Sequence, residues 1–335
     1  MKTFPFFSVV AAASLLGACS GGSTFEYDEA NALQKEVSGE KAFAHVEALV
    51  GFGPRPAGSD AIEQSRLYIE KALAEFGWSV ERQSFDSQTQ NGKKTFVNLR
   101  ARFGGSERWA EDVSGLLCSH YDTKPFAAFE FVGANDGGSS TGLLIELARV
   151  LAGRPQVANE IELVFFDGEE AFGSNITGKD GLFGSRHYAD ELVAENRKNR
   201  PAWGILLDMV GDKNLNIRAG ARIPGSNLRE LAEAKESGYL VDFAAVQARV
   251  DQLSRDLLAA SDDLELRRHI GISADYIIDD HVPLNVVAGI PTIDLIDFDF
   301  PYWHTPKDRL SEISAESLGI TGRVTLQLIE KYLMK

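Results

Sequence analysis

The sequence predicts an α/β protein: a single domain with a doubly wound, mostly parallel twisted sheet flanked by helices. Continuous apolar runs of strand length recur along the chain, as expected for strands that are covered on both faces. Segments with helical spacing of apolar residues separate these runs, and strands that alternate with helices form parallel sheets. The composition is that of a folded chain, with 44% hydrophobic and 25% charged residues among 335.

The predicted elements follow one another in the order that such a sheet requires. Asn91-Gly92 lies between two extended segments and favours a tight hairpin turn. Ser59 or Asp60 can cap a helix that stops at Gly77. The predicted strands cover 78–85, 95–103, 116–119, 161–166, 205–207 and 291–296. The predicted helices begin near Glu40 and after Ser59, and cover 143–151, 185–194, 227–235, 242–260 and 314–333.

The N-terminus has the features of a bacterial lipoprotein signal. A basic start and a short apolar run precede Leu16-Gly17-Ala18-Cys19, which resembles a lipobox. We expect a signal peptide over 1–18, a lipid anchor on Cys19, a flexible polar tether over 19–38 and the folded domain over 39–335. Ser20 follows the cysteine, which indicates an exported protein anchored at the cell envelope, on the periplasmic face of the outer membrane.

Charge and cysteine content narrow the possible functions. The formal net charge of -15 argues against nucleic-acid binding, which needs clustered Lys and Arg. With Cys19 lipidated, Cys118 has no partner for an intramolecular disulfide, so stability must come from burial of apolar surface. Cys118 lies within an apolar run, and we expect a buried, unreactive thiol there.

Acidic and histidine residues follow the predicted strands, where ligands bind in sheets of this kind. Carboxylates that converge in a dry crevice repel one another, and a divalent cation offsets this repulsion. Mixed Asp, Glu and His ligands suit zinc better than calcium or magnesium, and a catalytic zinc keeps one position open beside three protein ligands. The segments concerned are 120–122, 133–138, 167–170, 208 and 302–305.

Glu169 and Glu170 form an adjacent acidic pair directly after the apolar run 161–166. Neighbouring side chains point in different directions. One glutamate can therefore bind a metal while the other faces the open position as a general base.

Seven segments, taken together and in order, resemble the animal-type glutaminyl-peptide cyclotransferases of the zinc-dependent aminopeptidase superfamily. The similarity runs from about Glu40 to the C-terminus. The matching segments are 120–124, 131–136, 165–172, 182–187, 206–211, 279–283 and 303–305. The resemblance implies an enzyme that converts the N-terminal Gln of peptides or proteins to pyroglutamate and releases ammonia.

The resemblance also implies roles for individual residues. One zinc would be held by Asp136, Glu170 and His304, and Glu169 would be the catalytic acid/base. Asp279 and Asp208 would form a hydrogen-bonded carboxylate pair beside the substrate amine.

Further positions complete the implied site. Trp303 would line the substrate pocket. His120 and Asp122 match residues that hold and orient a second metal in dizinc aminopeptidases, whereas in the cyclases the equivalent histidine lies behind the ligands. His281 would position the loop of Asp279.

Two alternative functions stay open at this level. His120, Asp136, Glu170, Asp208 and His304 could supply a full two-zinc set, as in an aminopeptidase that releases N-terminal residues. A binding lipoprotein without catalysis is the other alternative, although such a protein would be expected to have lost Glu169.

The chain departs from the animal enzymes at two places near the implied pocket. Segment 173–176 around Asn175 lacks their pocket tryptophan, and Asp294 stands where they carry a histidine. These differences bear on the shape of the pocket and leave the three zinc ligands and Glu169 intact.

Overall fold

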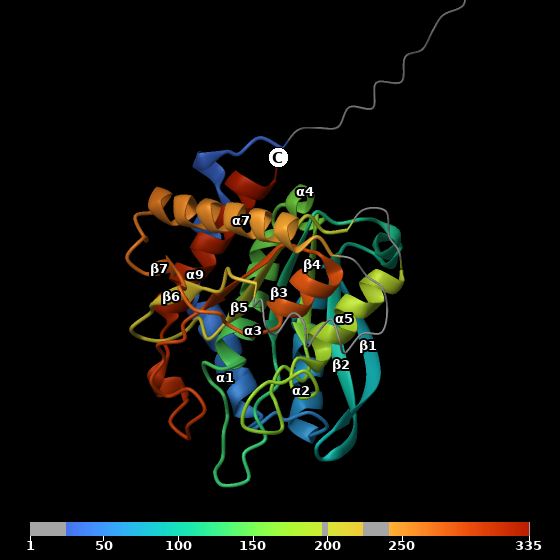
Figure 1. The fold of residues 1–335 in the computed structure, drawn as a ribbon. Coiled ribbons are helices and arrows are strands. Elements are labelled where there is room, and N and C mark those ends of the chain that lie inside the picture. Colours follow the sequence, from blue (N-terminus) through green and yellow to red (C-terminus); the bar gives the residue numbers. More distant parts are fainter. Residues whose placement is uncertain (1–24, 196–199, 224–240, 335) are drawn as a thin grey trace, which may run out of the picture.

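The computed structural model describes residues 25–195, 200–223 and 241–334. Its centre is a six-stranded sheet in the order β1-β2-β4-β3-β5-β8 (Figure 1). The strands are β1 (Trp78–Thr89), β2 (Gly92–Phe103), β3 (Gly115–His120), β4 (Ile161–Phe166), β5 (Trp203–Asp208) and β8 (Thr292–Ile296). Strands β4, β3, β5 and β8 are parallel, and β2 is antiparallel to both of its neighbours, β1 and β4. The predicted mostly parallel α/β sheet is confirmed.

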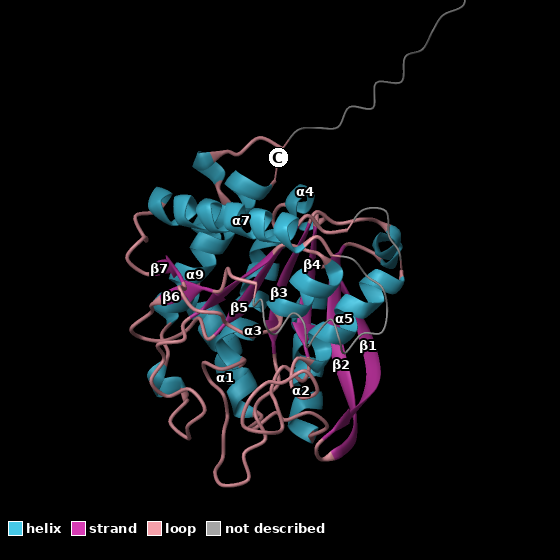
Figure 2. Ribbon diagram, viewed as in Figure 1, coloured by secondary structure: helices cyan, strands magenta, loops and turns pink. Residues whose placement is uncertain are grey.

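Helices cover both faces of this sheet (Figure 2). Side chains of the central strands alternate between two cores: Leu117 and Leu163 face one, whereas Leu116 and Val164 face the other. This two-sided burial explains why β3, β4 and β5 consist of continuous apolar runs. The helices are α1 (Gly39–Gly51), α2 (Asp60–Glu75), α3 (Gly138–Ala152), α4 (Pro155–Ala158), α5 (Phe183–Ala194), α7 (Phe243–Asp263), α8 (His281–Pro283) and α9 (Ala315–Leu328). Shorter helical turns are η1 (Glu29–Asn31), η2 (Leu33–Glu36), η3 (Ser106–Ala110), η4 (Leu284–Ala288), η5 (Leu310–Glu312) and η6 (Ile329–Leu333).

A second, small parallel sheet lies beside β8. It consists of β6 (Ile217–Ala219) and β7 (Ile270–Ile272), and a bridge between Gly220 and Asp294 attaches it to β8. These strands were not predicted, because three residues are too few to display a hydrophobic period.

The expected tether is partly folded. Within 25–38 the chain forms η1 and η2, Leu33 is buried, and the Leu33 N–H donates to Glu330 in η6. Packing of this kind depends on a distant helix, so the polar composition of the segment did not reveal it. The predicted signal peptide over 1–18, Cys19 and the predicted helix over 227–235 lie outside the described residues.

Cys118 is fully buried in the second core, as expected. Burial raises the pKa of its thiol well above the ordinary value, which keeps the group protonated. Among the described helices, none combines the length and the apolar character needed to cross a membrane.

Candidate active site

The carboxyl ends of three neighbouring parallel strands bring the predicted residues together. His120 is the last residue of β3, Asp208 is the last residue of β5, and Glu169 and Glu170 follow β4 by a few residues. Asp136 lies in the turn that precedes α3. Because parallel strands end at one edge of a sheet, residues far apart in sequence meet there.

Asp136, Glu170 and His304 form the first of two candidate metal centres. His304 Nε2 lies 3.4 Å from Asp136 Oδ2 and 3.3 Å from Glu170 Oε2. His304 has a positive φ of 55°, an uncommon conformation for a residue with a side chain. Such backbone strain often marks a functional position, which is consistent with the predicted ligand role.

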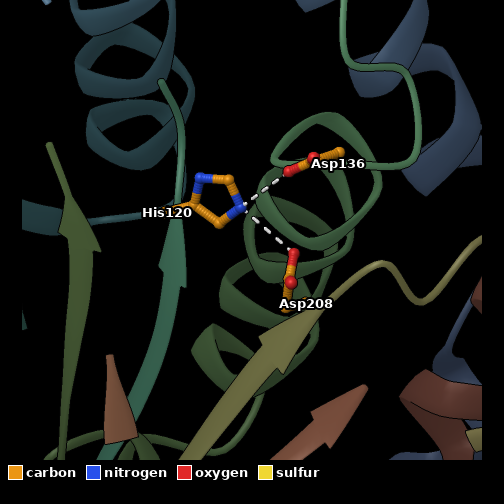
Figure 3. Close-up of side chains that lie close together, drawn as sticks. All are labelled: His120, Asp136 and Asp208. Carbon is orange, nitrogen blue, oxygen red and sulfur yellow. Dashed lines mark hydrogen bonds and ion pairs between the residues drawn. The ribbon is translucent and has the colours of Figure 1, made fainter. Parts of the chain in front are cut away.

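Figure 3 shows His120, Asp136 and Asp208, which form the second centre. Asp136 therefore belongs to both centres. His120 Nε2 lies 3.1 Å from Asp208 Oδ1 and 3.3 Å from Asp136 Oδ1. The other ring nitrogen, Nδ1, lies 3.4 Å from Asp122 Oδ1. The ring nitrogen that faces the site is therefore placed to bind a metal, with Asp122 orienting the ring from behind.

Two buried carboxylates hold the ligand loops through backbone N–H groups. Asp122 accepts hydrogen bonds from the N–H groups of Glu169 and Glu170, at 3.2 and 3.3 Å. Asp308 accepts from those of Asn135 and Asp136, at 2.7 and 3.0 Å. Asp308 was not singled out in the sequence, and its spacing of four residues after His304 was the one available signal.

The site is crowded with negative charge. Burial lowers the pKa of His304, but Asp136 and Glu170 outweigh this effect and raise the pKa to about 9. The pKa of His120 is likewise raised, since three neighbouring carboxylates outweigh its burial. The surrounding carboxylates thus favour positive charge at both imidazoles, a charge that a bound divalent ion would supply instead.

Glu169 differs from its neighbour Glu170 in its surroundings. Burial, together with the charges of Asp279 and Glu170, raises the pKa of Glu169 well above its ordinary value, against the opposing effect of His120. Glu169 lines the same cavity as Asp136, Glu170, Asp208 and His304. A carboxyl with a raised pKa in this position suits proton transfer at neutral pH.

Burial and the negative charge of Asp208 raise the pKa of Asp279 well above its ordinary value. Asp208 Oδ1 lies 3.1 Å from His120 Nε2, and the expected hydrogen-bonded pair of Asp208 and Asp279 stays a prediction. Asp279 accepts from the Asp280 N–H and lies within hydrogen-bonding reach of Asp294.

A cavity of about 710 Å³ opens over these groups. Trp303 lines it, as predicted, and its ring stacks on His304 at 4.2 Å between centroids. Asn175 and Ile176 line the wall where the animal enzymes carry a tryptophan, so the pocket is formed without that ring.

Comparison with known proteins places the chain in a family. The model of peptidase family M28 matches residues 98–329, which include every residue of both metal centres. The chain belongs to peptidase family M28. A glutaminyl-peptide cyclotransferase of Drosophila melanogaster is 31% identical over 273 residues, covering 78% of this chain and 72% of the relative.

Solved structures of M28-like enzymes share the fold. Porphyromonas gingivalis glutaminyl cyclase superposes with a TM-score of 0.73 at 26% identity, over 88% of this chain and 98% of that one. A leucine aminopeptidase precursor from Bacteroides thetaiotaomicron gives a TM-score of 0.71 at 25% identity, over 88% and 97%. Structures named for cyclase and for peptidase activity thus share this fold.

Proposed function

We propose that this M28 protein is a zinc-dependent glutaminyl-peptide cyclotransferase. The observation that carries the proposal is the cluster of Asp136, Glu170 and His304 beside the buried acid Glu169 in one cavity. The 31% identity to a named glutaminyl-peptide cyclotransferase supports this choice among the activities that the fold accommodates.

The donor set fits zinc. Two carboxylates and one imidazole match the ligands of catalytic zinc sites, which keep a fourth position for substrate. Asp136 Oδ2 is buried without a hydrogen-bond donor, as expected of an oxygen reserved for a cation. Bound there, zinc would polarise the γ-carbonyl of an N-terminal Gln.

The residues of the chain perform the remaining steps. Glu169 takes a proton from the attacking α-amino nitrogen and delivers it to the departing ammonia. Asp279, buried beside it, accepts a hydrogen bond from the same amine. Trp303 forms an apolar wall that holds the Gln side chain folded toward its own amine, so that proximity lowers the barrier.

The test combines two measurements on the purified chain. We expect ammonia release from Gln-Ala amide, none from Ala-Ala amide, and about one zinc per chain. Absence of ammonia release with zinc bound would overturn the proposal.

A second candidate is a dizinc aminopeptidase, which the His120–Asp136–Asp208 centre favours. Shared use of Asp136 would place two ions side by side, as two-metal hydrolases require. Two zincs per chain, together with release of free amino acids from peptides without Gln, would establish this function in place of the first.

We further propose that the protein is exported and anchored through a lipid on Cys19. The first described residues support a suitable orientation: Phe25 shares a groove with Ser114 and Glu160, which precede β3 and β4. That end of the sheet is opposite the active site, so an anchored enzyme would turn its cavity away from the membrane. Cys19→Ser should move the protein from the membrane fraction to the soluble fraction and abolish incorporation of labelled palmitate.

A further inference from the structure

We infer that Arg218 binds a carboxylate on the substrate beyond the N-terminal Gln, and so gives the enzyme a preference for acidic or very short peptides. The inference rests on the proposed cyclase function and names the substrate class of that site. The carboxylate can belong to the side chain of the next residue or to the C-terminus of a dipeptide.

Arg218 is distinguished by its lack of a charge partner. Lys124 and Arg218 are the only lysine and arginine among the described residues that line the cavity. Lys124 Nζ is occupied, since it donates to the Ala171 carbonyl at 2.7 Å and lies 3.5 Å from Glu170 Oε2. Within the described chain, Arg218 donates one hydrogen bond, from Nη1 to the Ile217 carbonyl, and forms no ion pair.

The guanidinium has a defined position on the cavity wall. Arg218 is the middle residue of β6 and pairs in register with Gly271 of β7. A Cβ at Gly271 would lie 2.8 Å from Nη1 and 2.9 Å from Cδ, so the side chain lies directly across this glycine. Gly220 fixes β6 to β8 through two backbone hydrogen bonds with Asp294. The position of Arg218 is therefore set by sheet pairing.

The remaining charge of the cavity explains why this cation matters. Acidic groups dominate the lining, and they attract the substrate's amine while repelling a carboxylate. Asp275 and Asp299 lie on the same wall, and Asp299 already accepts from the Asn216 side chain. An unpaired guanidinium offers two parallel N–H donors, a geometry that matches a carboxylate. A peptide with an amine on its N-terminal Gln and a carboxylate on the next residue thus finds complementary charge for both groups.

The experiment compares kcat/KM for Gln-Ala, Gln-Glu amide and the uncharged Gln-Ala amide. In the unmodified enzyme we expect at least one of the two carboxylate substrates to be favoured over the amide by about tenfold, as typical of a charge-assisted hydrogen bond. The favoured substrate identifies the source of the carboxylate. Arg218→Gln should bring the ratio of kcat/KM for the favoured carboxylate substrate to kcat/KM for Gln-Ala amide to about one. Arg218→Glu should favour Gln-Lys amide instead. Arg255→Gln, the same change at an exposed site on α7, should leave the ratio as it was.

Two further measurements test the inference. Added salt should reduce the preference of the unmodified enzyme, because screening weakens an ion pair at a half-buried site. An equal loss of kcat/KM for all three substrates in Arg218→Gln would assign a structural role to Arg218 and overturn the inference. Equal kcat/KM values for the three substrates in the unmodified enzyme would also overturn it. If the unmodified enzyme turns over none of the three, the proposed cyclase function itself fails and the inference falls with it.

Discussion

Glu169 and Glu170 are neighbours in the chain with different tasks. Glu170 faces a histidine and a lysine, His304 at 3.3 Å and Lys124 at 3.5 Å. Glu169 has no ion-pair partner among the described residues and projects into the cavity beside Asp279. Different surroundings thus make one carboxylate a candidate ligand and the other a candidate proton carrier.

Glu169→Gln should abolish most of the turnover while the metal stays bound. The amide keeps the size of the side chain but cannot carry a proton, so we expect kcat to fall by about 10²–10⁴-fold. Ammonia release and zinc content measured on the same sample check this. Glu130→Gln, at an exposed position, is the matched control. Turnover close to that of the unmodified protein would remove Glu169 from the mechanism.

Asp308→Asn should weaken metal binding without touching a ligand. The change puts an amide where a carboxylate now accepts the N–H groups of Asn135 and Asp136, so the turn that carries Asp136 loses its support. Loss of such support typically costs about 10–100-fold in metal affinity. Zinc retained against a graded chelator series measures the effect, with Asp86→Asn on the exposed hairpin as the control. Equal retention by both variants would contradict the assignment.

At the scale of elements, close packing of α1 against α3 fixes the position of the helix that follows Asp136. Gly142 in α3 faces α1, and a Cβ there would lie 2.6 Å from Val46 Cγ2 and 2.9 Å from the Ala42 carbonyl oxygen. The two helices can approach this closely only because the position is a glycine. The turn that carries Asp136 leads directly into α3, so the helix pair and the site are mechanically linked.

Gly142→Ala should therefore lower the free energy of unfolding. Overpacking of a close contact costs about 1–3 kcal/mol, which outweighs the gain in helix propensity from alanine. Thermal unfolding checks this, and Gly51→Ala is the control, since nothing lies within 4 Å of a Cβ at Gly51. A melting temperature of Gly142→Ala at or above that of Gly51→Ala would show that the helices separate at little cost.

At the scale of the molecule, the candidate ligands come from segments spread between β3 and the loop after β8. An unfolded chain cannot bring them together, so zinc should bind the folded state alone and stabilise it. At a free zinc concentration 100 times the dissociation constant, this contributes about 2.7 kcal/mol. A chelator should lower the melting temperature, and added zinc should restore it. A melting temperature insensitive to the chelator would exclude a metal centre built from these segments.

The sequence by itself determined the kind of elements, their order and the residues that cluster at the strand ends. Apolar runs predict buried strands because an apolar side chain by itself favours burial. Strands β3, β4 and β5 occur where such runs predict them. The resemblance to cyclases added the candidate ligands Asp136, Glu170 and His304, which the structure brings together.

Only the tertiary structure decided which of these groups face one another. Asp208 faces His120, Asp308 supports the turn of Asp136, and Arg218 stands without an ion-pair partner among the described residues. The short strands β6 and β7, which position Arg218, have too few residues for a periodic signal. Hydrophobic patterning records whether a side chain is buried, whereas the choice among polar partners depends on distances between segments far apart in the chain.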